Sequence, residues 1–246
     1  MKSTVEQVVP IEEIYVPEHY LEIPIPSWEA VVAPTLLQVS QQFNTQNDPS
    51  FVLLDEHVEA LQLPNIETVH ALKQFAMDTF KMRAIQTQFY SKLLPYLTVF
   101  YADTTSVILN SEELDAFKAL YVSRAKEAAA ERQESLEDYV KIVWNITEDI
   151  ENQLLERATE DFIYKLIARH DYFAKGHQID ETAYERFILQ QVLHQGADEI
   201  TVREHLSYQQ FAEIIPEMTY TQYLFDYFAS QFKFVIDTHK ERRNDV

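Results

Sequence analysis

The sequence predicts an all-α fold, and three observations support this. The chain of 246 residues contains only 2 glycines, where the usual ~7% would give roughly 17. Glycine supplies the positive-φ positions of β-hairpins, phosphate loops and barrel corners, so β-sandwiches, nucleotide-binding α/β domains and isomerase barrels are disfavoured. After residue 65 the apolar residues recur at helical spacing, and most of the 9 prolines precede that point.

The first 60 residues are predicted to be mainly extended. Residues 20–26 read Tyr-Leu-Glu-Ile-Pro-Ile-Pro, which suits an edge strand and excludes a helix. One short helix fits, from about Pro34 to Phe43. We therefore expect residues 1–60 to form a proline-rich, linker-like segment that packs on a helical domain of residues 61–246.

The first helices of that domain are predicted from capping residues and apolar spacing. Asn65 is the expected N-cap of a helix of about thirty residues that ends at Pro95. An extended run follows at residues 97–101. Asn110 then precedes two glutamates, which predicts a second helix that ends near Gln133.

The later helices are predicted in the same way. Ser135 to Asp138 resembles a capping box and opens a short helix through Trp144. Another long helix begins at residues 145–149 and stops at Gly176. The remaining expected helices run from near Asp180 to before Gly196, from a capping box at Thr201, and from Thr219 to Asp237.

The charge balance narrows the range of partners. The formal net charge is −20, which repels phosphate backbones and anionic membranes, so we expect neither nucleic acid nor membrane as a partner. The basic residues Lys240, Arg242 and Arg243 are too few to reverse this. No secretion signal and no membrane-spanning stretch is apparent, so we expect a cytoplasmic protein.

The candidates for catalytic or metal-binding chemistry are weak. Glu67 and His70 have the spacing of a di-iron ligand pair, but no second Glu-x-x-His exists in the sequence. His170 and His177 flank Gly176, where surface histidines are the commoner explanation. No cysteine, phosphate loop or nucleophile motif is present. We therefore expect no enzyme, no metal and no cofactor.

Several segments together resemble a known family. They occur in the order residues 108–114 (Ile-Leu-Asn-Ser-Glu-Glu-Leu), 135–141 (Ser-Leu-Glu-Asp-Tyr-Val-Lys), 147–150 (Thr-Glu-Asp-Ile) and Gly176-x-x-Ile179-Asp180. In order and spacing this is similar to the C-terminal, substrate-binding domain of the trigger factor family of bacterial chaperones. The resemblance extends from about Leu61 to Asp237, and residues 135–139 are its strongest match.

The chain departs from that family in several places. The ribosome-docking Gly-Phe-Arg-x-Gly-Lys motif and the inserted isomerase barrel are absent, so neither ribosome docking nor prolyl isomerisation is carried over. Two family glycines, near positions 134 and 145, are replaced by Glu134 and Asn145.

The resemblance implies an elongated helical body with two protruding arms, at about residues 110–175 and 179–215. Between such arms lies a cradle whose apolar side chains can hold unfolded polypeptides. It implies an ATP-independent, acidic holdase for unfolded or nascent chains, which dimerises as the family does. The candidate client-binding residues are Leu114, Phe117, Tyr121, Tyr139, Trp144, Phe187 and Phe211.

Three alternatives remain open at this point. Each candidate aromatic residue can instead pack one helix of a hairpin against the other. The same scaffold can also serve as a dedicated interaction or assembly factor for one partner. A helical enzyme would need a pocket of titratable residues, for instance around Glu67, His70 and His170.

Overall fold

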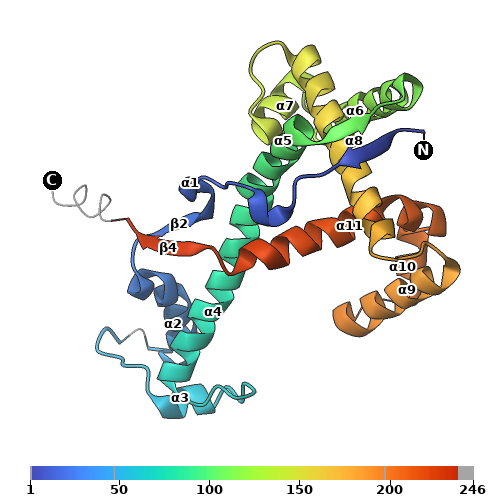
Figure 1. The fold of residues 1–246 in the computed structure, drawn as a ribbon. Helices are drawn as coiled ribbons and strands as arrows, with labels where there is room; N and C mark the ends of the chain where they lie inside the picture. The colour runs from blue at the N-terminus through green and yellow to red at the C-terminus, as the bar shows by residue number, and fades with distance from the viewer. Residues whose placement is uncertain (1, 47, 197, 238–246) are drawn as a thin grey trace. The chain divides into compact units, whose positions relative to one another are not determined.

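The computed structural model describes residues 2–46, 48–196 and 198–237 and is mostly helical (Figure 1). The predicted all-α class is therefore confirmed, with the addition of two small sheets. The chain forms two compact units, which are described separately below. The first unit comprises residues up to Ile14 and Leu94–Tyr227, and the second comprises Tyr15–Leu93 and the residues from Phe228 onward. This division does not fall at residue 61.

The first unit contains a short sheet and most of the helices. Strands β1 (Thr4–Gln7) and β3 (Ser106–Ile108) pair antiparallel, with Thr4 opposite Ile108. The helices are η1 (Ile11–Glu13), α5 (Leu94–Thr104), α6 (Ser111–Glu131), α7 (Leu136–Trp144), α8 (Ile150–Ala174), α9 (Glu181–Gln195), α10 (Glu199–His205) and α11 (Tyr208–Ala229), the last of which ends in the second unit.

The second unit pairs β2 (Glu22–Ile25) with β4 (Lys233–Ile236) in parallel, so that Ile23 lies opposite Phe234. Its helical elements are α1 (Glu18–Leu21), α2 (Trp28–Phe43), α3 (Asp55–Glu59), α4 (Val69–Gln88) and a π-helical turn, η2 (Phe89–Leu93). Its core includes a cluster of Val39, Val58 and Leu72.

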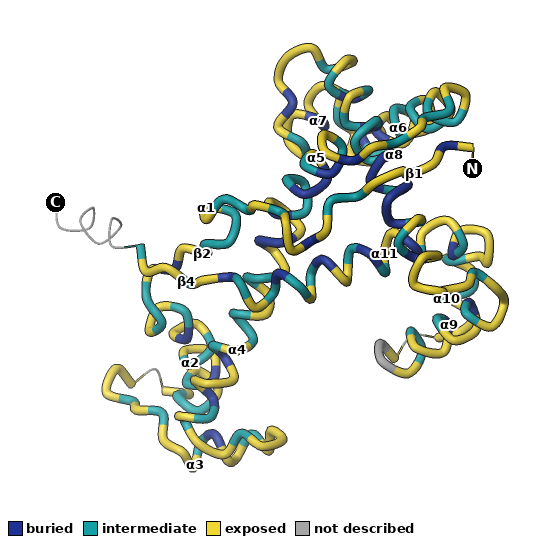
Figure 2. Tube along the Cα trace, viewed as in Figure 1, coloured by how far each residue is buried: buried dark blue, intermediate teal, exposed yellow. Residues whose placement is uncertain are grey.

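Helix α8 provides the core of the first unit, and its buried positions form dark stretches in Figure 2. It packs against α5, α6 and β1. Positions three or four apart on α8 are buried, as expected of a helix with neighbours on more than one side. The buried residues of α8 are Leu154, Ala158, Phe162, Ile163, Tyr164, Leu166, Ile167, Ala168 and Tyr172.

The capping residues predicted several helix starts correctly. The side chain of Asn110 accepts a hydrogen bond from the Glu113 amide at 3.1 Å. Ser135 accepts one from Asp138 at 3.0 Å, and Asp180 accepts one from Ala183 at 2.7 Å. Each bond satisfies an amide that the first helical turn leaves free.

Other predicted boundaries were wrong in the first half of the chain. Residues 97–101 are helical within α5, which includes Pro95. The π turn of residues 89–93 ends two residues before Pro95, and a wider turn there loosens the backbone bonding that a proline ring would otherwise disrupt. Helix α4 begins after Thr68, because Asn65 instead adopts φ +62° in a turn.

The N-terminal region contains more helix than predicted. Helix α2 begins at Trp28, with Ser27 as its N-cap, and includes Pro34. Both Pro34 and Ala30, whose carbonyl loses its partner, are exposed, so water can satisfy that carbonyl. Residues 20 and 21 belong to α1, so the prediction that residues 20–26 exclude a helix is wrong for these two residues.

The last helices are also shifted from their predicted positions. Helix α10 begins after Asp198, whose carboxylate caps the Thr201 amide, so Thr201 is not the cap. Helix α11 begins at Tyr208 and ends at Ala229, and residues 233–236 form β4 instead of continuing the helix. The run Lys-Phe-Val-Ile suits a strand, and its pairing with β2 outweighs the helical spacing upstream.

Candidate functional site

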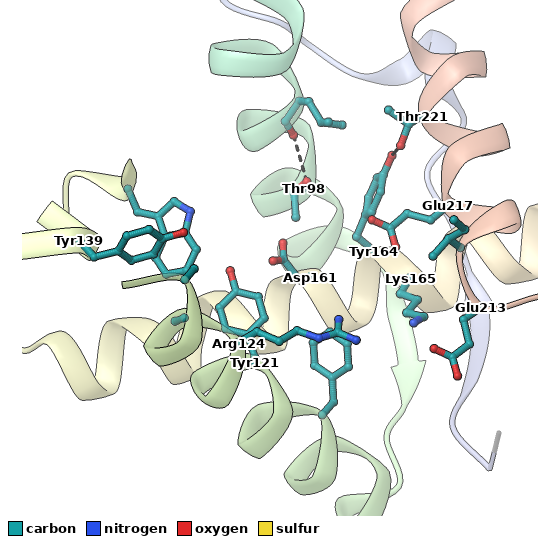
Figure 3. A pocket seen from close by; sticks show the side chains of 16 residues that line it. Thr98, Tyr121, Arg124, Tyr139, Asp161, Tyr164, Lys165, Glu213, Glu217 and Thr221 are labelled. Atoms are coloured by element: carbon teal, nitrogen blue, oxygen red, sulfur yellow. Dashed lines mark hydrogen bonds between the residues drawn. The ribbon is translucent and has the colours of Figure 1, made fainter. Parts of the chain in front are cut away.

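A cavity of about 580 Å³ in the first unit is lined by α5, α6, α7, α8 and α11. Figure 3 shows Tyr121 of α6 and Tyr139 of α7 on one side of the cavity, whereas most of the labelled charged side chains belong to α8 and α11. The cavity is therefore amphipathic, with an aromatic wall and a charged wall.

The aromatic wall is built from rings that contact one another. The Tyr121 ring stacks on Trp144, with ring centroids 5.7 Å apart and an angle of 25° between the planes. Tyr139 meets Trp144 edge-on at 5.7 Å. Phe117 packs against Phe162 at 5.2 Å. Offset and edge-to-face pairs of this kind hold the rings in fixed orientations.

Local sequence positions this wall. Ser135 starts α7, and the helix ends at Asn145, which adopts the left-handed conformation with φ +57°. Between them, Tyr139 and Val140 are buried against Ala129 of α6 and Leu154 of α8. The short helix α7 is thereby fixed at both ends and along one side, which brings Tyr139 and Trp144 to the cavity.

The charged wall contains carboxylates in an unfavourable environment. Burial raises the pKa of Asp161, and its hydrogen bond with the Tyr121 hydroxyl and the nearby Arg157 partly oppose this. Figure 3 shows the Tyr121 hydroxyl directed toward Asp161. Glu217 is exposed, but desolvation by the surrounding protein still raises its pKa, which Lys165 lowers and Asp161 raises further. The remaining charged groups at the cavity are Arg124 and Glu213.

Four of the seven predicted client-binding residues line this one cavity. They are Phe117, Tyr121, Tyr139 and Trp144. Phe117, Tyr121 and Trp144 are half-buried, whereas Tyr139 is buried. Leu114, one turn before Phe117 on α6, is half-buried and does not line the cavity.

The two candidates from the second predicted arm lie elsewhere. Phe211 is 1% exposed and packs with Tyr184 and Ile188 in the core that joins α9 to α11, so it offers no surface to a client. Phe187 is half-buried against Phe211, with ring centroids 5.5 Å apart. For Phe211 the packing alternative is therefore correct, because the hairpin needs an apolar core of its own.

Sequence reasoning did not identify the charged residues of the cavity. Asp161 and Lys165 are one turn apart on α8, and Glu213 and Glu217 have the same spacing on α11. Pairs of this kind are also typical of solvent-exposed helix faces. Only the tertiary packing shows that both pairs border one cavity, so no local signal distinguishes them.

The candidates for metal binding and catalysis are divided between the two units. Glu67 and His70 belong to the second unit, whereas His170 belongs to the first. Among the side chains that the structure describes, no group of three or more His, Asp or Glu residues is placed to hold a metal ion.

Within the described ranges, no helix has both the length and the apolar composition needed to cross a bilayer.

Comparisons with known proteins identify no relative. No protein-family model, no curated protein and no solved structure matches this chain.

Proposed function

We propose that the protein is an ATP-independent, chaperone-like holdase that binds unfolded segments of other polypeptides in the aromatic cavity. The observation that carries this proposal is the gathering of Phe117, Tyr121, Tyr139 and Trp144 around one cavity of about 580 Å³. Aromatic side chains provide large apolar contact areas that accept many different sequences. The resemblance to the client-binding domain of trigger factor that we infer from the sequence motivates the same proposal.

The energetics favour weak and reversible binding. Burying three aromatic side chains of about 200 Å² each gives a gross ~15 kcal/mol at 25 cal/mol/Å². Immobilisation of a flexible client removes roughly 4–15 kcal/mol of this. The rings also pack partly on one another, so less of their surface is available to a client. A holdase requires such modest affinity, because its clients must leave in order to fold.

The net charge of the chain indicates which clients the proposed holdase would favour. A formal net charge of −20 favours neutral or basic clients. The proposal places the holdase in the cytoplasm and assigns it neither ribosome docking nor prolyl isomerisation. A homodimer that encloses the cavity is part of the same hypothesis, and sedimentation of the purified protein tests it.

The test uses one variant in the cavity and one matched control. Phe117→Ser removes an aromatic side chain from the cavity, and Phe75→Ser removes one that is 51% exposed on α4 of the second unit. Light scattering of a chemically denatured client reports aggregation. We expect suppression by the wild type and by Phe75→Ser, and weaker suppression by Phe117→Ser, with circular dichroism confirming that both variants fold.

Tryptophan fluorescence measures directly whether a client binds in the cavity. The chain contains 2 tryptophans, and Trp28 lies in the second unit against Phe234. In a Trp28→Phe background, Trp144 is the sole fluorescent indole, so a reduced and carboxymethylated client should shift its emission. Failure to suppress aggregation at molar excess contradicts the holdase. One stoichiometric partner in a pull-down would then favour the dedicated interaction factor.

A further inference from the structure

A second cavity of the first unit, of about 390 Å³, has chemistry unlike that of the aromatic cavity. Its lining comes from residues 8–12, α5, α8 and α11. Its volume lies in the range typical of sites for small molecules. Among its lining residues are Tyr101, Tyr220, Tyr223, Asp171 and Glu12.

Three tyrosine rings form the aromatic part of this cavity. Tyr101 is 1% exposed and Tyr220 is 4% exposed, with ring centroids 6.0 Å apart and a hydrogen bond between their hydroxyls. Tyr223 follows at 6.1 Å from Tyr220 and is partly exposed. Burial raises the pKa of Tyr101 to about 12, and the faces of all three rings are electron-rich.

Two carboxylates border the same rings. Asp171 and Glu12 both line the cavity, and both act electrostatically on Tyr101 and on Tyr223. His170 also lines the cavity. Electron-rich rings beside carboxylates are the arrangement that recognises organic cations.

Lys175 of the same chain contacts one carboxylate and one ring of this cavity. The Lys175 ammonium lies 2.9 Å from a carboxylate oxygen of Asp171 and 3.7 Å from the centre of the Tyr223 ring. Lys175 does not line the cavity itself, and its side chain is 41% exposed. An alkylammonium is therefore already held at the edge of the site, by one carboxylate and one ring.

We propose that this cavity binds a small primary alkylammonium ligand, with the ammonium between Asp171, Glu12 and the tyrosine rings. Glu12 and Asp171 carry two negative charges, and Lys175 supplies one positive charge, so a monocation would complete the balance. The ligand's apolar chain would contact Ile167 and the faces of the rings. This inference does not depend on the proposed holdase function.

The test compares n-butylammonium with 1-butanol by isothermal titration calorimetry at low ionic strength. The two probes share an alkyl chain and differ in the charged group. We expect n-butylammonium to bind at least about tenfold more tightly, the scale of one charge-assisted hydrogen bond. Equal binding of the two probes, or no binding of n-butylammonium at millimolar concentration, overturns the proposal.

Two variants with opposite expected effects distinguish the loss of a specific binding site from general damage to the fold. Asp171→Asn should weaken n-butylammonium binding about tenfold. Lys175→Met should tighten it, because the internal competitor is removed, and a merely damaged fold would not produce this gain. Asp226→Asn is the matched control, since that exposed carboxylate bonds Gln222 and does not line the cavity. An unchanged affinity in both cavity variants contradicts the proposal.

A further probe identifies the source of the ammonium. N-acetyl-lysine amide carries the same alkylammonium on a peptide-like group. Binding of n-butylammonium alone indicates a free small amine, whereas binding of both probes indicates the lysine side chain of a polypeptide. Either result supports the site.

Discussion

The hydroxyl of Tyr164 on α8 lies 2.8 Å from the hydroxyl of Thr221 on α11, and both residues line the aromatic cavity. The bond joins two helices that supply the charged wall (Figure 3). Because Tyr164 is 4% exposed, water competes little for its hydroxyl. The bond therefore helps to fix the spacing of α8 and α11 within the charged wall.

Thr221→Val should lower the free energy of unfolding by about 0.5–1.5 kcal/mol, because it removes one hydroxyl while keeping a similar shape. Tyr164→Phe should have a similar effect. Urea unfolding of both single variants and of the double variant measures the coupling. The double variant should cost less than the sum of the two singles, and full additivity would show that the two hydroxyls do not stabilise each other.

The raised pKa of Asp161 predicts how folding stability depends on pH. The folded state holds the proton of Asp161 more tightly than the unfolded chain does, mainly because of burial. Above the ordinary carboxyl pKa of 3.8, ionisation of Asp161 therefore costs folding stability, and this cost is complete above the folded-state pKa. Asp161→Asn should thus gain stability relative to the wild type as the pH rises.

Urea unfolding at several pH values between 4 and 8 measures this difference. The control is Asp115→Asn, which removes an exposed carboxylate from the neighbouring helix α6. Its stability relative to the wild type should change less over the same range. If Asp161→Asn instead loses stability relative to the wild type as the pH rises, the charge of Asp161 stabilises the fold and the prediction fails.

A third prediction concerns the attachment of β1. The Glu113 carboxylate accepts hydrogen bonds from the backbone amides of Lys2 and Ser3, the latter at 2.8 Å. These bonds lower the pKa of Glu113. Its contribution to stability is therefore present above the ordinary pKa of 4.5 and is lost as the pH falls through the lower folded-state pKa.

Glu113→Ala should release the start of β1, and amide hydrogen exchange measures this at Ser3 and Val5. Glu112→Ala is the matched control. Glu112 forms an exposed ion pair with Lys2 at 3.2 Å, and such pairs contribute little. Similar exchange rates in the two variants would show that Glu113 does not hold the strand.

The fold was predictable wherever local chemistry determines it. Asn110, Ser135 and Asp180 cap helices because their side chains reach an amide in the first turn, and three or four residues of sequence contain that information. The C-terminal region was less predictable, because β4 exists only through pairing with β2, about 210 residues earlier. The π turn before Pro95 is likewise a response to the fold and has no sequence signature.

The candidate site was likewise predictable only in part. Phe117 and Tyr121 are one turn apart on α6, so their shared face followed from helical spacing. Phe211 shares that aromatic character but is buried in a different core. Composition and spacing alone do not distinguish an aromatic residue at a cavity from one in a core, and this distinction required the packing of α9 on α11.

The final prediction concerns the two turns that end α6 and α7. Asn145 adopts φ +57° after α7, and Gln133 adopts φ +59° after α6. The following amides complete these helix ends, with Glu134 donating to Ala129 at 3.0 Å and Ile146 donating to Val140 at 3.3 Å. Both helices therefore end in the left-handed geometry that glycine adopts most easily.

Because a left-handed residue with a side chain costs about 1–2 kcal/mol, Gln133→Gly should raise the free energy of unfolding by about 1 kcal/mol. Asn145→Gly should change it less, since asparagine tolerates this conformation, and Asn145→Val should lower it. Urea unfolding measures all three variants. Ala130→Gly, at an exposed position within α6, is the control and should lose about 1 kcal/mol. A loss of the same size in Gln133→Gly would mean that residue 133 gains nothing from the freedom of glycine.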